Sequence, residues 1–331
     1  LLEGAVRHGE LVKRCRDEAM PAVAVTDRAN LFGAMQLGDA AKKVGVQPIL
    51  GALMPLAPIE TGPSRPGGTC KNAPEPVLLL VKDEAGWRNL LKLMSRAYLD
   101  ADPADEICIT LTDLEACNAG LICLSGGAIG PVGGALARGD AAAAGRVFLK
   151  LREIFDGRFY QEIMRHGQDV EAQTEDALLD LAYDHDVPLV ATNDVHFLDA
   201  EMHEAHDVLL CLAQSTTLAD EDRKRVTPEH RFKSAAEMAE LFEDLPEAVQ
   251  NTLVIARRCA FTAPARAPIL PTFALDEAAE MRRQAAEGLE RRLREAVWTE
   301  AMDETAREAA ARPYRERLAY ELDVIAQMKF P

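Results

Sequence analysis

Two residues near the middle of the chain have the types and spacing best suited to chemistry. Asp194 and His196 follow an apolar run at 189–193 and lie two positions apart, so an extended backbone points both side chains the same way. Carboxylate and imidazole groups are ligands of zinc-like ions. The ends of buried strands are where α/β barrels carry such groups. This pair is therefore the first candidate for a metal or catalytic site, and a loop with two solvated polar residues is the alternative.

A second histidine pair follows closely. His203 and His206 are three positions apart on a predicted helix, with Glu204 between them, so they share one helix face. The pair lacks the His-Glu-x-x-His spacing of metalloproteases, which favours a structural or solvated pair over a metal site. Three further histidines lie in charged surroundings and are predicted to be surface groups: His8, His185 and His230.

The elements that position these residues alternate between strand and helix. Strands are predicted at 22–26, 48–53, 77–81, 121–124, 158–164 and 189–193, and helices at 9–19, up to 44, and at 84–99, 140–155 and 169–184. Six such units in succession predict a parallel sheet with right-handed crossovers. No G-x-G-x-x-G segment follows a strand, which favours a closed barrel over an open Rossmann sheet.

Glycine and proline mark the breaks between these elements. The segment 55–76 is rich in both and is predicted to have no regular structure. Ser125, Gly126 and Gly127 are predicted to form a tight turn after a strand. Although this region is glycine-rich, it lacks the Lys-Ser/Thr of a phosphate-binding loop, so no nucleotide site is predicted there.

Composition limits the classes of function. The 331 residues carry a net charge of −17, which repels phosphate backbones and argues against a nucleic-acid groove. The seven cysteines are odd in number and scattered, as is typical of reduced thiols. The sequence has no run of about 18 apolar residues and no signal peptide. We therefore expect a cytoplasmic protein without membrane association.

The last third of the chain has a different character. Helices are predicted at 237–242 and 246–259, and a proline-rich stretch at 263–271 then suggests a domain boundary. A long charged helix at 275–297 and a last helix at 313–330 follow. This part is predicted to be entirely helical.

Four segments give the chain a resemblance to a known family. They are AVTDRANLFGA (24–34), LSGG (124–127), ATNDVHF (191–197) and YELDVIAQM (320–328). In these segments, in order and from end to end, the chain resembles the alpha subunits of bacterial DNA polymerase III, the replicative C-family polymerases. The segment 27–33 is more similar to the main replicase than to a translesion paralogue.

The resemblance implies a fold and a domain organisation. Residues 1–265 would be a polymerase-and-histidinol-phosphatase (PHP) domain, a distorted (β/α)7 barrel, and 266–331 a helical lead-in to the polymerase palm and thumb. A first strand with a His-x-His-type segment would precede Leu1, so the chain is expected to be an N-terminal fragment. Template-directed DNA synthesis, with its Mg²⁺ ions, DNA and dNTPs, would belong to parts of the parent protein outside this span, which would contain no catalytic residue of that reaction.

The resemblance also implies a metal site in this span. Four residues match metal ligands of the family: Glu3, His166, Asp194 and His196. Three positions have lost theirs: Arg28 replaces a histidine, Leu53 a carboxylate and Pro76 a histidine. Arginine stays protonated and cannot ligate a cation. The site is therefore interpreted as vestigial or partial, a zinc-like ion is doubtful, and Arg28 is expected to pair with Asp194 in place of a metal.

Two functions of different class remain. The first is a structural module that docks the proofreading exonuclease subunit, among the other subunits of the replicase; the family resemblance implies it, and an acidic surface suits a protein partner. The second is a metal-dependent 3′–5′ exonuclease or phosphoesterase. The three lost ligand positions favour the first. A free-standing phosphatase is disfavoured because it would have no use for the helical tail.

Overall fold

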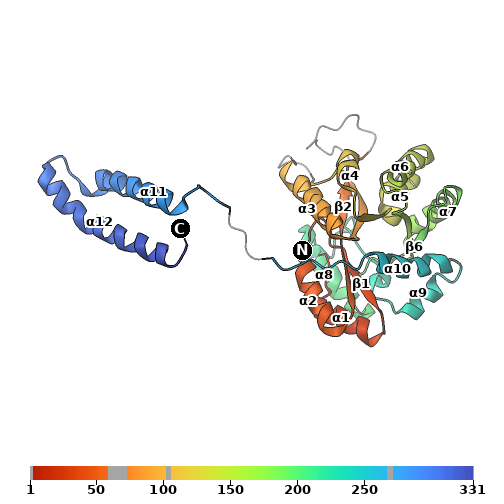
Figure 1. The fold of residues 1–331 in the computed structure, drawn as a ribbon. Coiled ribbons are helices and arrows are strands. Elements are labelled where there is room, and N and C mark those ends of the chain that lie inside the picture. Colours follow the sequence, from red (N-terminus) through yellow and green to blue (C-terminus); the bar gives the residue numbers. More distant parts are fainter. Residues whose placement is uncertain (1–2, 59–72, 102–105, 267–270, 331) are drawn as a thin grey trace. The chain divides into compact units, whose positions relative to one another are not determined.

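The computed structural model describes residues 3–58, 73–101, 106–266 and 271–330 (Figure 1). The chain divides into two compact units, Leu1–Pro264 and Ala265–Pro331. The first unit combines a sheet with helices, and the described part of the second unit is helical. The mixed α/β class predicted from the sequence is confirmed.

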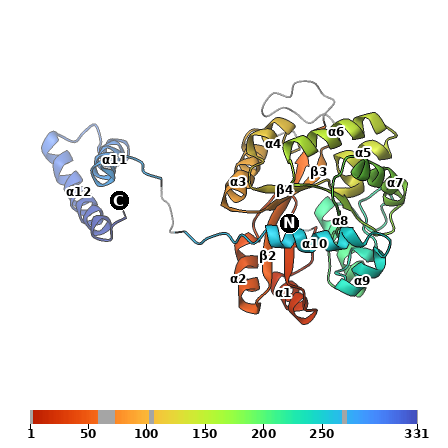
Figure 2. The ribbon, with the colours of Figure 1, turned by 45° about the vertical axis from the view of Figure 1, so that its right-hand side comes forward.

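A six-stranded sheet forms the centre of the first unit, and it curls into half of a barrel (Figure 2). Its strands are β1 (Ala22–Val25), β2 (Gln47–Leu56), β3 (Glu75–Val81), β4 (Leu121–Leu124), β5 (Phe159–Ile163) and β6 (Leu189–Ala191). They lie in the sheet in the order of the sequence, so β1 and β6 are its two edges. All six predicted strands are present, because each is an apolar run between turn-forming residues.

The sequence pattern predicted a sheet of parallel strands, and this was wrong for one strand. β3 runs antiparallel to both β2 and β4, and the other pairs are parallel. Leu56 lies opposite Glu75, so the connection from β2 to β3 leaves and returns at the same end of the sheet. Between β3 and β4 the chain forms two helices rather than one. After the second helix the chain is back at the end of β3, where the Lys82 N–H donates to the Gly120 carbonyl at 2.9 Å. A single crossover helix would have produced a parallel pair.

Ten helices are described in the first unit. They are α1 (His8–Asp17), α2 (Ala34–Val44), α3 (Glu84–Leu99), α4 (Leu111–Cys117), α5 (Pro131–Ala137), α6 (Ala141–Ile154), α7 (Asp169–Asp184), α8 (His203–Gln214), α9 (Ala235–Leu241) and α10 (Pro246–Arg258). The sequence pattern did not predict α4 and α5. Both have only seven residues, too few for a helical period to stand out, and α5 contains Gly133 and Gly134, which disfavour helix.

The two faces of the sheet are buried by different partners. Alternate strand residues such as Leu79 and Cys123 belong to the main core, together with apolar residues of α2 to α7. The intervening residues, including Leu80 and Ile122, form a smaller core with Ile255 of α10. Both faces of the sheet are thus buried by apolar side chains, which explains why most of these strands are continuous apolar runs.

The second unit contains α11 (Glu277–Arg292), a short π-helical turn (Leu293–Val297) and α12 (Glu304–Gln327). Arg282 and Asp323 join α11 to α12 at 2.8 Å. The predicted start of the last helix at 313 was wrong by about two turns. Asp303 caps the helix by accepting from the Ala306 N–H, and Pro313 lies inside it. None of the helices in the described ranges is long and apolar enough to cross a membrane.

The structure differs from the sequence prediction at the cysteines and in the segment 55–76. Five described cysteines are free and buried: Cys15, Cys117, Cys123, Cys211 and Cys259. Cys108 is disulfide-bonded, so the expectation of reduced thiols throughout was wrong. Of the segment 55–76, both ends are strand rather than irregular, and 59–72 lies outside the described residues.

Candidate functional site

The C-terminal ends of β5 and β6 bring three of the predicted ligands together. The Asp194 N–H donates to Nε2 of His166 at 3.2 Å, and Asp194 Oδ2 lies 3.2 Å from Nε2 of His196. Both histidines are buried, whereas 45% of the Asp194 side chain is exposed. Parallel neighbouring strands end on the same edge, which is why residues 28 positions apart meet here.

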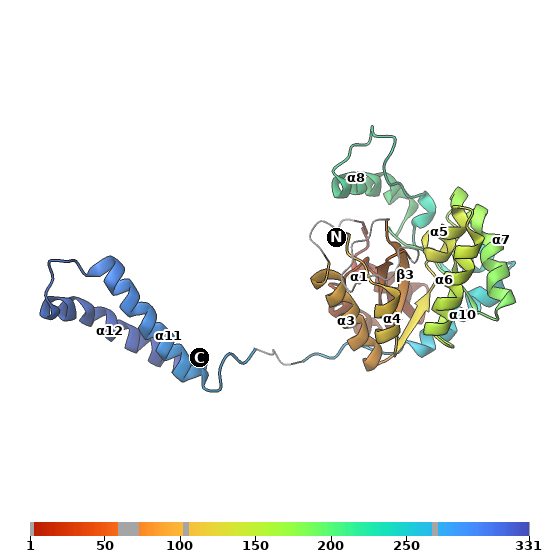
Figure 3. The same ribbon diagram turned by 90° about the horizontal axis from the view of Figure 1, so that it is seen from above.

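Glu3 joins this group through its backbone and its carboxylate. Its carbonyl oxygen accepts from Nδ1 of His196 at 2.9 Å and from Nε2 of His206 at 2.6 Å, and α8 accordingly lies beside the start of the chain (Figure 3). Its carboxylate faces two cations, with Nζ of Lys224 at 3.4 Å and Nε of Arg28 at 3.9 Å. The expected partner of Arg28 was Asp194; the ion pair that the structure contains is with Glu3.

The positions without ligand atoms continue along the same edge of the sheet. Arg28 forms an isolated parallel bridge with Leu53 of β2. Pro76 begins β3 at the end of the sheet where β2 finishes, and a Cβ built on Gly126 would lie 2.1 Å from the Pro76 carbonyl oxygen. Only glycine tolerates that approach and the φ of +83°. All seven residues matched to ligand positions of the family thus lie at one end of the sheet, where β2, β5 and β6 finish. We call this end the rim.

His166 is held by a carboxylate that sequence reasoning did not find. Glu171, in the first turn of α7, places Oε1 at 2.7 Å from Nδ1 of His166 and accepts the His166 N–H at Oε2, also at 2.7 Å. Because Nε2 accepts the amide of Asp194, the ring carries its proton on Nδ1 and donates it to Glu171. These hydrogen bonds lower the pKa of Glu171, against the effect of its burial.

His230 was predicted to lie on the surface, and this was wrong. It is 4% exposed and stacks on His166 with 4.0 Å between ring centroids. Its carbonyl accepts the N–H of His196 at 2.9 Å. Burial, followed by the neighbouring rings of His166 and His196, lowers the pKa of His230 to about 4. No periodic pattern could have revealed it, because it lies in a segment without strand or extended helix.

Glu162 is a second group that the sequence analysis missed. It is fully buried in β5, where it accepts the Thr192 hydroxyl at 2.6 Å and the Gly126 N–H at 3.1 Å. Burial raises its pKa to about 7, and the negative charge of Asp194 adds to the effect. The signal was available, since Gln161 and Glu162 are polar residues in a strand that is otherwise apolar.

The other histidines have structural roles. His203 bonds the Val226 carbonyl at 2.8 Å, and His206, 2% exposed, bonds Glu3, so the pair is structural rather than solvated. Burial lowers the pKa of His206. His185 packs 5.8 Å from the ring of Phe148 and, like His8, is half-buried rather than fully at the surface.

The donor atoms of the rim do not fit a metal ion as they are arranged. His166 already uses Nε2 to accept an amide proton. Both ring nitrogens of His196 already face acceptors, the Glu3 carbonyl and Asp194 Oδ2, so neither is free to ligate an ion as the site is arranged. The hydrogen bond with Asp194 raises the pKa of His196 against the effect of burial. Partial burial would raise the pKa of Asp194, but the same hydrogen bond brings it to about 2. Within the described ranges no three His, Cys, Asp or Glu side chains are placed to share an ion.

Comparison with known proteins gives a consistent result. The PHP domain family matches residues 1–166. DNA polymerase III subunit alpha of Caulobacter vibrioides is 44% identical over 335 residues, which cover 100% of this chain and 28% of that protein. The subunit alpha of Rickettsia bellii is 38% identical over 99% of this chain, and that of Pseudomonas aeruginosa 37% over 100%. The chain spans about 28% of the length of these relatives.

Proposed function

The chain belongs to the PHP domain family, and from this premise we propose that it is a PHP module without a metal cluster, serving a bacterial DNA polymerase III alpha subunit. The PHP domain would extend over 1–265, and 266–331 would lead toward the palm and thumb. The whole protein would be the cytoplasmic, template-directed DNA polymerase of chromosome replication, with Mg²⁺, DNA and dNTPs bound outside this span. The matches to three alpha subunits, which cover 99% or 100% of this chain, support this proposal.

The observation that carries the non-catalytic role is the charge arrangement at the rim. Arg28 and Lys224 face the carboxylate of Glu3, and the ring of His196 faces Asp194. In a metal-binding member of such a family, cations would be attracted to these carboxylates. Here the protein's own cations compensate them, so the rim holds its shape without a metal.

We further propose that the module docks the proofreading exonuclease subunit. The net charge of −17 argues against direct contact with DNA and suits a protein partner. Phe32, four positions after Arg28, is 72% exposed, and its N–H is fixed by the side chain of Asn30 at 3.2 Å. A rigidly presented aromatic residue is a typical anchor of an interface.

Docking is tested by measuring binding of the exonuclease subunit to the immobilised full chain. Phe32→Ser should weaken binding at least about tenfold, which corresponds to 1.4 kcal/mol. Phe273→Ser is the matched control, because this residue is similarly exposed (76%) but belongs to the second unit. Binding that is equally affected by both variants, or by neither, would contradict this docking surface.

A metal-dependent 3′–5′ exonuclease or phosphoesterase is the second candidate. It is favoured by the Glu171–His166 pair, since a carboxylate behind a histidine is the usual support of a metal ligand. The test is hydrolysis of single-stranded DNA with Zn²⁺, Mn²⁺ or Mg²⁺ by the full chain. We expect none above background. Metal-stimulated cleavage that disappears in the His166→Ala, Asp194→Asn double variant would establish this second function instead.

A further inference from the structure

Residues 200–226 project from one side of the first unit, and we call this element the flap (Figure 3). It consists of a short 3₁₀ turn (Ala200–Met202), α8 and the loop that returns to Thr227. Its buried apolar side chains, Leu210 and Cys211, belong to none of the three apolar clusters that the described residues of the first unit form. Segments outside the core open at a lower free energy than the core itself.

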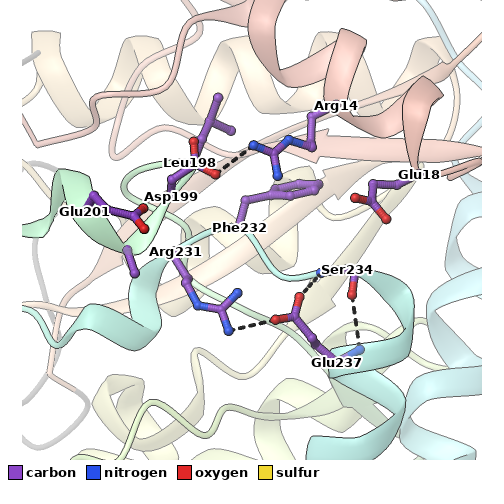
Figure 4. A pocket seen from close by; sticks show the side chains of 10 residues that line it. Arg14, Glu18, Leu198, Asp199, Glu201, Arg231, Phe232, Ser234 and Glu237 are labelled. Atoms are coloured by element: carbon purple, nitrogen blue, oxygen red, sulfur yellow. Dashed lines mark hydrogen bonds and ion pairs between the residues drawn. The ribbon is translucent and has the colours of Figure 1, made fainter.

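The two ends of the flap are fixed to each other and to α1, and we call these ends its base. The Phe232 N–H donates to the Phe197 carbonyl at 2.9 Å, and Phe197 forms an isolated parallel bridge with Arg231. Asp199 forms an ion pair with Arg14 of α1 at 2.7 Å (Figure 4). The flap therefore begins and ends at one rigid place in the fold.

Within the flap, side chains join α8 to the returning loop. Nε2 of His203 lies 2.8 Å from the Val226 carbonyl oxygen, and Nη2 of Arg223 lies 2.6 Å from Oδ2 of Asp207. A surface loop whose ends are close together and whose own side chains hold it compact is a structural unit. The flap can therefore move without separating into helix and loop.

Glu3 is the residue outside the flap that receives its polar contacts. Its carbonyl oxygen accepts from Nε2 of His206 at 2.6 Å, and its carboxylate lies 3.4 Å from Nζ of Lys224. Within the described residues, the side-chain hydrogen bonds and ion pairs that leave the flap all go to Glu3. The rings of His196 and Phe197 each lie 5.2 Å from the ring of His206. The closed flap thus lies against the rim, and few contacts hold it there.

The closed flap also contains buried polar atoms without partners. Nδ1 of His206, Oγ1 of Thr216 and Nε of Arg223 make no hydrogen bond to any described residue. Among the described residues of the first unit, the other buried side-chain atom of this kind is Oε1 of Gln161, so three of the four belong to the flap. Burial of an unpaired polar atom costs free energy that contact with water recovers. These atoms therefore favour opening of the flap over opening of the sheet.

We propose that the flap turns away from the rim as a unit about its base, and that Glu3 holds it closed. Opening breaks the hydrogen bond from His206 to the Glu3 carbonyl and brings the His206 ring and Cys211 into water. It also uncovers the side of the rim at His196. The flap thereby controls how solvent and solutes reach the histidines of the rim.

Cysteine labelling of the native full chain tests this without any substitution. Cys211 on α8 and Cys117 on α4 are free thiols with similar exposed fractions, 5% and 4%, but Cys117 belongs to the main core. The chain reacts with iodoacetamide in the absence of reductant, and peptide mass spectrometry follows each cysteine. Each rate is divided by the rate of the same cysteine in the urea-unfolded chain. We expect Cys211 to react at least about tenfold faster than Cys117. Equal rates would mean that the flap opens only when the whole unit unfolds, and would overturn the proposal.

Two variants of His206 test the role of Glu3. His206→Gln keeps a side-chain N–H donor for the Glu3 carbonyl, whereas His206→Met has a similar length and no donor; both remove the ring and its unpaired nitrogen. Cys211 should react roughly five- to tenfold faster in His206→Met than in His206→Gln, which corresponds to the loss of one hydrogen bond. Cys117 should react at the same rate in both. Equal labelling of Cys211 in the two variants, or a parallel increase at Cys117, would overturn the proposal.

Discussion

The two halves of the rim differ in the types of residue that they carry. At the ends of β5 and β6, His166, Asp194 and His196 keep the residue types of ligands, and Glu171 supports His166 from behind. Beside β1 to β3, the corresponding places hold a permanent cation, a leucine and a proline. The comparison shows that residues of ligand type can form a hydrogen-bonded structural unit of their own, because the two buried histidines would be costly to leave unpaired.

The largest effect is expected when residues that can ligate a metal are introduced beside β1 to β3. The triple variant Arg28→His, Leu53→Glu and Pro76→His should bind at least one Zn²⁺ per chain, whereas the native chain should not. Structural zinc sites bind the ion with apparent free energies on the order of 10 kcal/mol, so even a partial set of imidazole and carboxylate ligands should hold one. Metal analysis after dialysis measures this, with circular dichroism to verify folding. A folded triple variant without zinc would show that the two halves are not parts of one site.

The next largest effect is expected at Glu171, whose carboxylate holds His166 by two hydrogen bonds. Glu171→Ala leaves Nδ1 and the N–H of His166 without their buried acceptor, so it should lower the free energy of unfolding by about 3 kcal/mol. Urea denaturation measures the change. Asp180→Ala, at an exposed position of the same helix, is the control and should stay within about 0.5 kcal/mol. Equal effects would mean that Glu171 acts only through helix α7.

A pH-dependent effect is expected from Glu162, which lies between the two halves. Its pKa rises from a usual 4.5 to about 7 on folding, so the folded chain binds more protons than the unfolded chain between these values. Stability is therefore greatest below pH 4.5 for this group and falls as the pH rises through 7. Glu162→Gln removes this dependence and should be more stable than the native chain above pH 7, by up to about 3 kcal/mol. As the control, Glu204→Gln keeps Glu162, so its difference in stability from the native chain should not change with pH. A pH-independent difference for Glu162→Gln would contradict the assignment.

The smallest effect is expected at the ion pairs of Glu3. The side chains of Arg28, Lys224 and Glu3 are about 40% exposed, so water and salt weaken their attraction. Arg28→Met and Lys224→Met should each cost less than about 1 kcal/mol, and less still in 0.5 M salt. Urea denaturation at low and high salt measures this. A salt-independent loss above about 2 kcal/mol would show that these cations have a larger role than compensating a partly exposed carboxylate.

The sequence predicted the parts of this fold that depend on local patterns. The six strands follow from apolar runs. The positions of Asp194 and His196 follow from their place after such a run, whereas His166 was found only through the family resemblance. The direction of β3 could not be predicted, because it depends on whether one or two helices return the chain. The partner of Arg28 and the burial of His230 depend on segments far apart in sequence that meet only in the folded chain.

The most direct test of the central claim is the metal content of the native chain. The purified full chain is equilibrated with Zn²⁺, Mn²⁺ or Mg²⁺, dialysed without chelator and analysed for bound metal per chain. We expect less than one ion, because His166 and His196 already use their ring nitrogens and the carboxylate of Glu3 already faces Arg28. Two or three tightly bound ions per chain would contradict it and would make the rim a working metal cluster.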